Sequence, residues 1–557
     1  MKRFNYKRAN IIIVAVFAIG GLVQAGTITV GSERGNYDFH NIQDGIDAAE
    51  DGDIVLVAPK EYEITEPITF RGKAITVRSE EGPEQTMIRM SKPPMGWNAE
   101  YALVLFDNGE DYRSLLEGFT LRGSPANGVL CLGSSPRLEN CVMTSNTSRG
   151  VRCLTGSSPT IAYCKIIGNR DGGVKCEEYS SPTITHCILS RNWGDSGVFC
   201  VGFCSPTITN CIISGNKNHL GAGVRCQDSS SPTIINCLIS GNLAPTAGGG
   251  VFVGFSSATI TNCTISGNSA GEGDGVYCEN SSLTLTNCIL WDGDNEIFDL
   301  YNSNSKTMIT YSNIKGGFPG DGNIDIEPLF VEPGYWINVK DPNAFWINGD
   351  YHLKSEAGRW DPNSKIWVAD GVTSPCIDAG DPNSNWFEEL WPHGGRINMG
   401  AYGGMVEASM SLSQVGDARD FNNDGLITWD DVLMLADKWD SNYVPLKENL
   451  DLDGVVDAND LNFYSDWSID SNNTAPVIDV IEDQNTVVGN ELSFVVSAID
   501  DDSDDLTYLA LGLPHGATFE EQMFIWTQEQ AGTYLVTFVV SDYKSLDYLT
   551  VQITVED

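Results

Sequence analysis

Basic residues are scarce in this sequence. Lys and Arg together number 33 against 75 Asp and Glu, so the formal net charge is −42. Binding to nucleic-acid phosphates requires a basic face, and a chain with this excess of negative charge repels polyanions in general. The composition therefore excludes a general nucleic-acid-binding protein.

Long apolar runs are absent after the first 25 residues, where none approaches the roughly 18 residues that span a bilayer. Residues 1–25 themselves have the order of an export signal: basic residues, an apolar run from Ile11 to Val23, and a small-residue cleavage site at Ala25. We therefore expect a signal peptide over 1–25, no membrane span after its removal, and an extracellular protein. It is either secreted or attached to the cell surface, with the periplasm as an alternative.

Two signatures of catalysis are also missing. No Gly-rich phosphate loop opens a helix, and no cysteines are paired with the spacing of a zinc site. The six His residues are scattered, which is more typical of surface or core-filling side chains than of a catalytic base. Phosphate-loop and zinc chemistry are therefore not indicated.

Cysteine, by contrast, is abundant and regularly spaced. Most of the 15 cysteines form two series, Cys141, Cys164, Cys187, Cys211, Cys237, Cys263 and Cys288, and Cys131, Cys153, Cys176, Cys200, Cys226 and Cys278, with Val253 in the one gap. A fixed period of roughly 20 to 30 residues is typical of a solenoid, in which each coil buries its apolar face against the next. We expect the cysteines to stack as buried thiols, with some disulfides as the alternative.

Each repeat consists of short β-branched runs broken by Gly, Pro, Ser and Asn, as in 157–169, which predicts strands and turns. One repeat is then one coil, and successive coils lie about 4.8 Å apart. A third series is predicted to form turn residues whose amides hydrogen-bond along the stack. Its members are Asn146, Asn169, Asn192, Asn216, Asn242 and Asn268.

This pattern resembles the right-handed parallel β-helix family typified by pectate lyases, over roughly residues 26–330. Residues 41–49, followed by the strand at 52–57, are similar to the capping helix and first strand of such proteins. Residues 374–382 and 397–403 look like the tail that closes many bacterial β-helix surface proteins. The resemblance implies an all-β chain with a β-helix and an end-closing segment over 26–410.

Acidic residues concentrate towards the end, and two segments of the form D/N-x-D/N-x-D-G, starting at 420 and 449, match calcium loops. The candidate ligands are Asp420, Asn422, Asp424, Leu426, Thr428 and Asp431 in the first loop and Asn449, Asp451, Asp453, Val455, Asp457 and Asp460 in the second, with Leu426 acting through its carbonyl. Acidic turns without metal are the alternative.

Each loop runs into a short apolar stretch without an incoming helix, so residues 411–472 resemble a dockerin, a small α-helical calcium module. The resemblance implies Ca²⁺ and a cohesin-like protein partner, contacted through 429–430 and 458–459. Residues 473–557 alternate as strands do and are similar to bacterial Ig-like or cadherin-like β-sandwiches. The Asp-rich run at 500–505 is either a further calcium ligand set or a solvated loop.

A candidate binding stripe lies in the repeated Gly-Val-x-Cys motif, where alternation points Val and Cys inward and x outward. The x positions proposed to bind substrate are Arg152, Lys175, Phe199, Arg225, Phe252 and Tyr277. Aromatic faces stack on sugar rings and Arg forks match carboxylates, which favours an acidic polysaccharide as ligand. Long side chains that merely shield the strand face are the alternative.

Catalytic candidates are fewer. In a uronate lyase, Lys175 or Arg225 would be the base that removes the proton beside the sugar carboxylate, with Asp171, Asp195 or Glu177 close enough to hold Ca²⁺. In a hydrolase, Asp171 and Asp195 would be the two carboxylates. The sequence thus predicts a secreted β-helix protein that handles polysaccharide, as a lyase or glycoside hydrolase if it is an enzyme. A non-catalytic surface or adhesion scaffold is the alternative.

Overall fold

The computed structural model describes residues 25–32, 36–90, 101–300, 306–337, 344–441, 445–470 and 473–557. The expected signal peptide, apart from its last residue, lies outside these ranges. Within them, no helix has the length and apolar character needed to cross a membrane.

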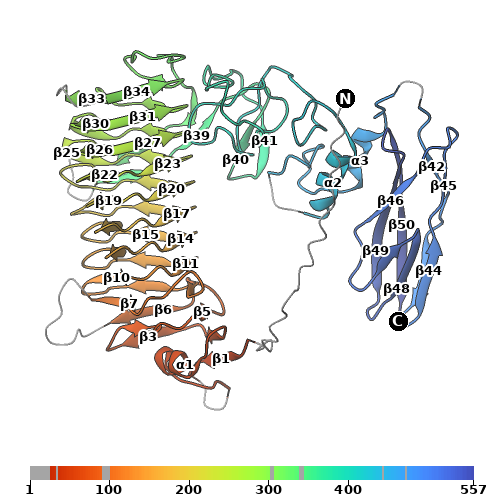
Figure 1. Cartoon of the computed structure of the whole chain (residues 1–557), viewed down its shortest axis with the longest axis horizontal. Coiled ribbons are helices and arrows are strands. Elements are labelled where there is room, and N and C mark those ends of the chain that lie inside the picture. The colour runs from red at the N-terminus through yellow and green to blue at the C-terminus, as the bar shows by residue number, and fades with distance from the viewer. Residues whose placement is uncertain are drawn as a thin grey trace, which may run out of the picture.

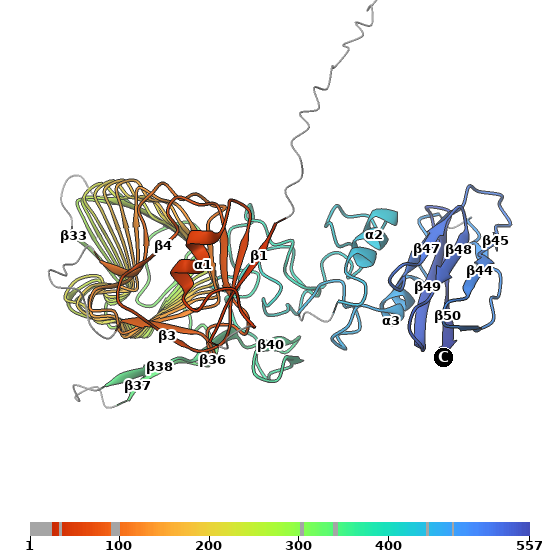
Figure 2. The ribbon, with the colours of Figure 1, turned by 90° about the horizontal axis from the view of Figure 1, so that it is seen from below.

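A right-handed parallel β-solenoid forms the first half of the chain (Figures 1 and 2). Its three parallel sheets contain 12, 10 and 11 strands, here called the first, second and third sheet. The first sheet comprises β1 (Thr27–Val30), β2 (Ile54–Val57), β5 (Thr76–Ser79), β8 (Leu115–Glu117), β11 (Arg137–Glu139), β14 (Thr160–Ala162), β17 (Thr183–Thr185), β20 (Thr207–Thr209), β23 (Thr233–Ile235), β27 (Ser257–Thr261), β31 (Ser282–Thr286) and β34 (Lys306–Thr310).

The other two sheets complete each coil. The second sheet comprises β4 (Ile68–Thr69), β7 (Ala102–Phe106), β10 (Asn127–Leu132), β13 (Val151–Leu154), β16 (Val174–Glu177), β19 (Val198–Val201), β22 (Val224–Gln227), β26 (Val251–Gly254), β30 (Val276–Glu279) and β33 (Ile297–Leu300). The third comprises β3 (Glu61–Ile64), β6 (Met87–Met90), β9 (Thr120–Arg122), β12 (Val142–Thr144), β15 (Lys165–Ile167), β18 (Ile188–Ser190), β21 (Ile212–Ser214), β24 (Leu238–Ser240), β28 (Thr264–Ser266), β32 (Ile289–Trp291) and β35 (Asn313–Ile314).

Equivalent cysteines of successive coils stack inside the solenoid. Cys153 pairs in register with Cys176, and Cys176 with Cys200. All 15 cysteines are free and buried. Burial raises the pKa of Cys278 to about 11, which keeps its thiol neutral. The prediction of stacked thiols is confirmed, and the alternative of disulfides is wrong.

The asparagine series forms a buried ladder, as predicted. Asn169 Nδ2 donates to Asn192 Oδ1 at 3.1 Å, and Asn192 Nδ2 donates to Asn216 Oδ1 at 3.0 Å. The ladder also explains the Gly of the repeated motif. A Cβ atom on Gly197 would lie 2.8 Å from both Asn216 Nδ2 and the Gly223 carbonyl oxygen, so only glycine fits beside the amide.

Helix α1 (Ile42–Ala48) lies across the N-terminal end of the coils (Figure 1). Asn41 caps it by accepting a hydrogen bond from the Asp44 main-chain N–H. Ile42 and Ile46 are buried in the solenoid core. The predicted capping helix is confirmed, and it covers strand ends that would otherwise be exposed.

The segment after the solenoid contains three antiparallel pairs, β36 (Phe330–Glu332) with β39 (Asp350–Leu353), β37 (Tyr335–Ile337) with β38 (Phe345–Ile347), and β40 (Arg359–Asp361) with β41 (Ile366–Val368). We expect this tail to close the end of the solenoid, but the structure places its later part along a side. Met399 and Ala401 pack on Leu238 and Ile289 of the third sheet. Leu238 and Ile289 are apolar side chains on the outer face of the third sheet, and the tail shields them from solvent.

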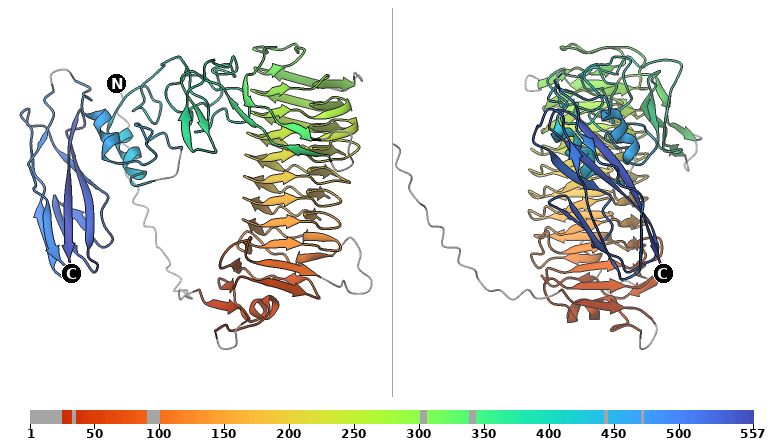
Figure 3. Two further views of the ribbon diagram at one scale, coloured as in Figure 1. Left: turned by 180° about the vertical axis from the view of Figure 1, so that it is seen from behind. Right: turned by 90° about the vertical axis from the view of Figure 1, so that its right-hand side faces the viewer.

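Two short helices, α2 (Trp429–Asp437) and α3 (Ala458–Leu461), the latter continued by a 3-10 turn (Asn462–Tyr464), follow the two acidic loops. They lie between the tail and a C-terminal sandwich (Figures 1 and 3). The sandwich strands are β42 (Val477–Ile478) and β45 (Ala498–Ile499), the four-stranded sheet β43 (Gln484–Val487), β50 (Leu546–Glu556), β49 (Gly532–Ser541) and β46 (Thr507–Leu511), and the three-stranded sheet β44 (Glu491–Val495), β48 (Met523–Thr527) and β47 (Thr518–Glu520).

Candidate functional site

The outward stripe of the second sheet has the predicted register. Its members pair in coil order as Arg152, Lys175, Phe199, Arg225, Phe252 and Tyr277. Because neighbouring coils are hydrogen-bonded strands, each member lies directly above the next. The stripe therefore exists as one continuous row of side chains.

The aromatic end of the stripe is buried, contrary to the expectation that it faces solvent. Phe252 is 3% exposed and Tyr277 7%, and their rings stack with centroids 5.2 Å apart. Leu220 and Ala247 pack on this pair. These covering residues lie in longer turns that include the pair β25 (Leu243–Ala247) and β29 (Ser269–Glu272).

The cationic part of the stripe belongs to a larger group of ionised side chains, here called the charged cluster. Its members are Arg149, Arg152, Asp171, Lys175, Glu177, Asp195 and Arg225. Within the cluster, the Glu177 carboxylate pairs with two cations. It lies 2.8 Å from Arg152 Nε and 3.0 Å from Lys175 Nζ. All predicted catalytic candidates are therefore brought together on one face.

Arg149 links the two carboxylates that we predicted for a hydrolase. Its Nη2 lies 3.4 Å from Asp171 Oδ2 and 3.7 Å from Asp195 Oδ2. Arg225 lies on the next coil, and its Nη1 is 4.0 Å from Asp195 Oδ1. Sequence reasoning missed Arg149, although its place directly before the Gly-Val-x-Cys motif at Gly150 puts it on the edge of the same face.

Phe199 lies at the centre of the cluster. Lys175 Nζ is 5.1 Å from its ring centroid, and the Arg225 guanidinium carbon is 4.6 Å away. Both distances suit cation–π attraction, which holds the two cations over the ring. The ring is 9% exposed, so it acts as a floor for the charges rather than as an open platform for a sugar.

The pKa values of Asp195 and Glu177 are shifted in opposite directions. Burial raises the pKa of Asp195. For Glu177 burial acts in the same direction, but the hydrogen bonds from Arg152 and Lys175 outweigh it and hold the pKa below the ordinary value. Carboxyl pairs with pKa values pushed apart are typical of acid–base catalysis. Burial also lowers the pKa of Arg225.

Two donors of the cluster have no acceptor. Arg149 Nε and Arg225 Nε are buried atoms without a hydrogen-bond partner. Buried guanidinium N–H groups are costly to leave unpaired. The cluster therefore holds two guanidinium N–H groups whose hydrogen-bonding capacity is not used within the described chain.

The two predicted calcium loops each close on their last Asp. Asp431 accepts from the main-chain N–H of Phe421 at 2.9 Å and of Thr428 at 2.9 Å. Asp460 occupies the same place in the second loop, where burial raises its pKa to about 6. Thr428 and Asp457 cap α2 and α3, which explains why a helix starts at each loop end.

One observation favours a metal in the second loop. Asn449, at its first position, is 4% exposed, and its Oδ1 is buried without a hydrogen-bond partner. An orphaned amide oxygen at this position fits a hard cation such as Ca²⁺. Within the described ranges, no three His, Cys, Asp or Glu side chains gather closely enough to hold a metal on their own. Amide, hydroxyl and main-chain oxygens are therefore needed as ligands as well.

The remaining predicted ligands lie along the two loops. Asp420 accepts from the main-chain N–H groups of Asp424 and Gly425, and Asn422 and Asp451 accept from the residues two positions later. The others are Leu426, Thr428, Asp453, Val455 and Asp457. These are the contacts that a tight acidic turn makes without metal, so the ligand assignment stays a prediction.

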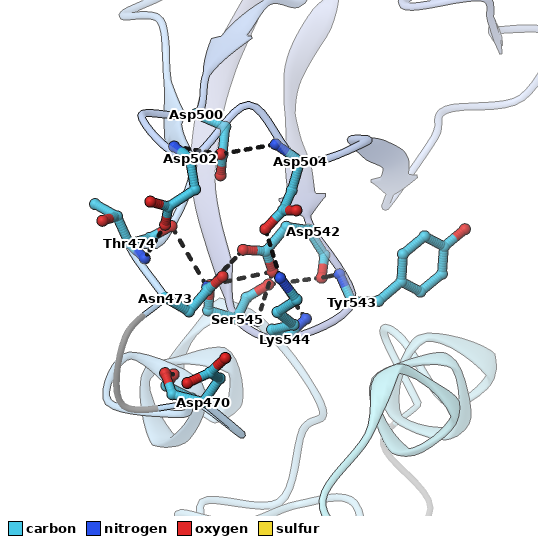
Figure 4. A network of polar contacts seen from close by, with 12 residues as sticks. Asp470, Asn473, Thr474, Asp500, Asp502, Asp504, Asp542, Tyr543, Lys544 and Ser545 are labelled. Atoms are coloured by element: carbon cyan, nitrogen blue, oxygen red, sulfur yellow. Dashed lines mark hydrogen bonds and ion pairs between the residues drawn. The ribbon is translucent and has the colours of Figure 1, made fainter.

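A polar network ties the first residues of the sandwich to two of its loops (Figure 4). Asn473 Nδ2 donates to Asp542 Oδ2 at 2.6 Å, and Lys544 Nζ lies 2.7 Å from Asp504 Oδ2. Lys544 thus already supplies one positive charge to the Asp-rich run at 500–505.

Comparison with known proteins gives two family matches. The family described as "Right handed beta helix region" matches residues 102–253 and 197–322, and the family described as "Putative Ig domain" matches 475–556. No curated protein matches the chain.

The solved structures that the comparison matches to this chain share little sequence with it. Pectate lyase Pel9A is 15% identical, with 68% of this chain and 96% of that chain covered and a TM-score of 0.45. The mannuronan C-5 epimerase A-module of Azotobacter vinelandii is 17% identical, with 48% and 94% covered and a TM-score of 0.32. The pectin methylesterase of Aspergillus niger is 14% identical, with 53% and 92% covered and a TM-score of 0.26. The two family matches show that the chain contains a right-handed β-helix repeat region and a C-terminal Ig-like domain.

Proposed function

We propose that the protein binds an acidic extracellular polysaccharide on the outer face of the second sheet, at the charged cluster. The observation that carries this proposal is the gathering of Arg149, Arg152, Lys175 and Arg225 on one face of a chain with a net charge of −42. Four cations against three carboxylates leave the cluster with one positive charge. Arg forks bind carboxylates through two parallel hydrogen bonds, so a uronic acid polymer suits this face.

Cleavage is the second part of the proposal, and two reactions compete. In a hydrolase, Asp195 would donate the proton to the leaving oxygen and Glu177 would act as base or nucleophile, which their opposite pKa shifts support. In a lyase, Lys175 or Arg225 would remove the proton beside the sugar carboxylate, and the glycosidic bond would break to leave a double bond. The lowered pKa of Arg225 supports this second reaction.

The test replaces three cations together, as Arg152→Ser, Lys175→Ser and Arg225→Ser, and measures retention of the full chain on polygalacturonate gels. The matched control carries Lys165→Ser, Lys306→Ser and Lys315→Ser, which remove the same charge from exposed positions outside the cluster. We expect retention to be lost in the first variant and kept in the control. Unchanged retention of the first variant contradicts the proposal.

A non-catalytic surface or adhesion scaffold is the second candidate function. It is favoured by the pairing of every cluster cation with a carboxylate, because charges that satisfy one another can also serve only to stiffen the rod. Incubation with polyuronates and neutral glycans separates the two. Unsaturated products indicate a lyase and new reducing ends a hydrolase, whereas binding without any product favours the scaffold.

We also propose the order of parts as a signal peptide over 1–25, the β-helix with its closing segment over 26–410, a dockerin-like calcium module over 411–472 and the sandwich over 473–557, in an exported protein. The orphaned Asn449 Oδ1 supports Ca²⁺ in the module. A cohesin-like partner would have to use the side of α2 where Asp430 and Leu433 are exposed, because the apolar side packs on the sandwich.

A further inference from the structure

A second row of side chains projects from the turn between the third and second sheets. It consists of the residues that directly follow three ladder asparagines, Arg170, Trp193 and Lys217, and is called the turn row here. Trp193 and Lys217 are joined by a parallel bridge, so they lie on adjacent coils about 4.8 Å apart. The buried ladder fixes the turn, and the next residue points outward: Trp193 is 57% exposed.

The β37–β38 hairpin lies against this row (Figure 2). Trp346 holds it there, because its ring covers the turn glycines Gly241 and Gly267, where any Cβ atom would lie within 2.5 Å of the indole. Lys217 Nζ donates to the Ala344 carbonyl oxygen at 2.8 Å. The hairpin is thus fixed to the solenoid at two points.

Between the row and the hairpin is an open pocket of about 250 Å³. Arg191, Trp193, Gly215, Lys217 and Phe345 line it. Ligand pockets for drug-sized molecules start at about 300 Å³, so this one suits a single sugar unit of a longer chain. Two of these residues are exposed aromatics, Trp193 on the solenoid turn and Phe345 on the hairpin, and their rings form apolar walls on opposite elements.

The pocket has two cations without a carboxylate partner. Arg191 lies over the Phe345 ring at 5.4 Å and Lys217 over the Trp336 ring at 5.1 Å. In the part of the chain that the structure describes, neither forms an ion pair, whereas the cations of the charged cluster all do. Burial lowers the pKa of Lys217 because it disfavours the charged ammonium group. A bound anion would offset this effect by stabilising the charge.

We propose that this pocket is a separate binding site for a carboxylated sugar, with the sugar ring stacked on Trp193 and its carboxylate facing Arg191 and Lys217. Unpaired cations on a strongly acidic chain select an anionic ligand, and an exposed indole face selects a flat apolar ring surface. The ligand class rests on the proposed function, but the residues are on a different turn and on the hairpin.

The test is calorimetric titration of the full chain with trigalacturonate. Trp193→Ala and Arg191→Gln should each weaken binding to this site about tenfold, the effect of losing one stacking or charge-assisted contact. Trp193→Phe keeps an aromatic face and should recover most of the affinity. Trp193 is exposed, so Trp193→Ala should leave the thermal unfolding midpoint unchanged.

Two controls define the outcome. Tyr163→Ala removes another aromatic side chain, 63% exposed, at a different corner of the solenoid and should leave binding unchanged. Neutral maltotriose should not bind. Equal affinity of wild type and the Trp193→Ala, Arg191→Gln double variant, equal binding of maltotriose, or no binding of trigalacturonate by the wild type would overturn the proposal.

The same titration distinguishes the two sites. If the triple Ser variant of the charged cluster binds trigalacturonate as the wild type does and the Trp193→Ala variant binds it about tenfold more weakly, the pocket stands and the proposed function of the cluster fails. If the triple Ser variant alone loses trigalacturonate, the pocket proposal is overturned.

Discussion

The indole ring of Trp429 on α2 meets the phenol ring of Tyr543 in the sandwich edge-on, with 6.4 Å between their centroids. Beside this pair, Val432 and Leu435 share one apolar core with Leu511. The apolar side of the helix is therefore covered by the sandwich of the same chain. If either α2 with its loops or the sandwich unfolds, the apolar side chains of the other part at this contact become exposed to solvent.

Leu511→Ala tests this coupling. The side chain is 5% exposed, and its truncation should lower the free energy of unfolding by about 2–4 kcal/mol, because it leaves a cavity at the junction. Hydrogen exchange should then accelerate in α2 and β49 to a similar extent. Leu513→Ala, at a position 38% exposed in the following loop, is the control. Faster exchange in only one of the two segments would show that they are independent.

Calcium should stabilise the loops. Added Ca²⁺ should slow hydrogen exchange over 420–431 and 449–460, and a chelator should reverse the effect. Asp424→Asn keeps the side-chain oxygen that accepts from the Leu426 N–H at 2.9 Å but removes one charge, so calorimetry should show Ca²⁺ affinity reduced about tenfold in the first loop. Asp437→Asn, in the last turn of α2, should have no effect. No uptake of Ca²⁺ by the wild-type chain would exclude the calcium proposal.

Glu389 should make stability depend on pH. Burial raises its pKa from 4.5 to about 8, while its Oε1 accepts from the N–H groups of Asn398 at 2.8 Å and Gly404 at 2.7 Å. The folded state therefore retains a proton that the unfolded chain releases. Its contribution is fully present below pH 4.5 and is lost as pH rises to about 8, by up to about 1.4 kcal/mol per pH unit.

Glu389→Gln keeps the accepting oxygen and removes the titration. Urea unfolding between pH 5 and 8 should show a flatter pH dependence for the variant than for the wild type. Glu388→Gln, whose wild-type side chain is 56% exposed, is the control and should keep the wild-type slope. Identical slopes for Glu389→Gln and the wild type would show that Glu389 does not hold the proton.

The asparagine ladder should contribute strongly to stability. Asn192 Nδ2 donates to Asn216 Oδ1 at 3.0 Å and to the Ile166 carbonyl oxygen at 2.9 Å. Asn192→Ala leaves these buried groups unpaired, which should cost about 2–4 kcal/mol in chemical denaturation. Thr183→Ala on the exposed side of β17 should cost less than about 0.5 kcal/mol. A small effect at Asn192 would mean that water replaces the amide.

The inward positions could be predicted from the sequence because each coil repeats them. Cys176 and Asn192 are members of regular series, and both stack as the spacing predicts. The same regularity gave the register of the outward stripe. The capping helix, in contrast, is predicted by the resemblance of residues 41–49 to β-helix proteins.

The burial of the outward positions could not be predicted in the same way. Phe252 is covered by Leu220 and Ala247, which lie in turns longer than the repeat and therefore break its period. Phe345 reaches the turn row through a hairpin that follows the solenoid, and the contact between Lys217 and Ala344 joins residues 127 positions apart. No periodic signal connects such residues, so the sequence does not predict the pocket between the turn row and the hairpin.

Because each rung of the solenoid buries its core mainly against the rungs on either side, the length of the solenoid is independent of its cross-section. Duplication or deletion of one complete repeat leaves compatible surfaces at the join and shifts the surface pattern by one step. The spacing between the charged cluster on the middle coils and the modules that follow the solenoid can thus evolve in discrete increments without redesign of the interior.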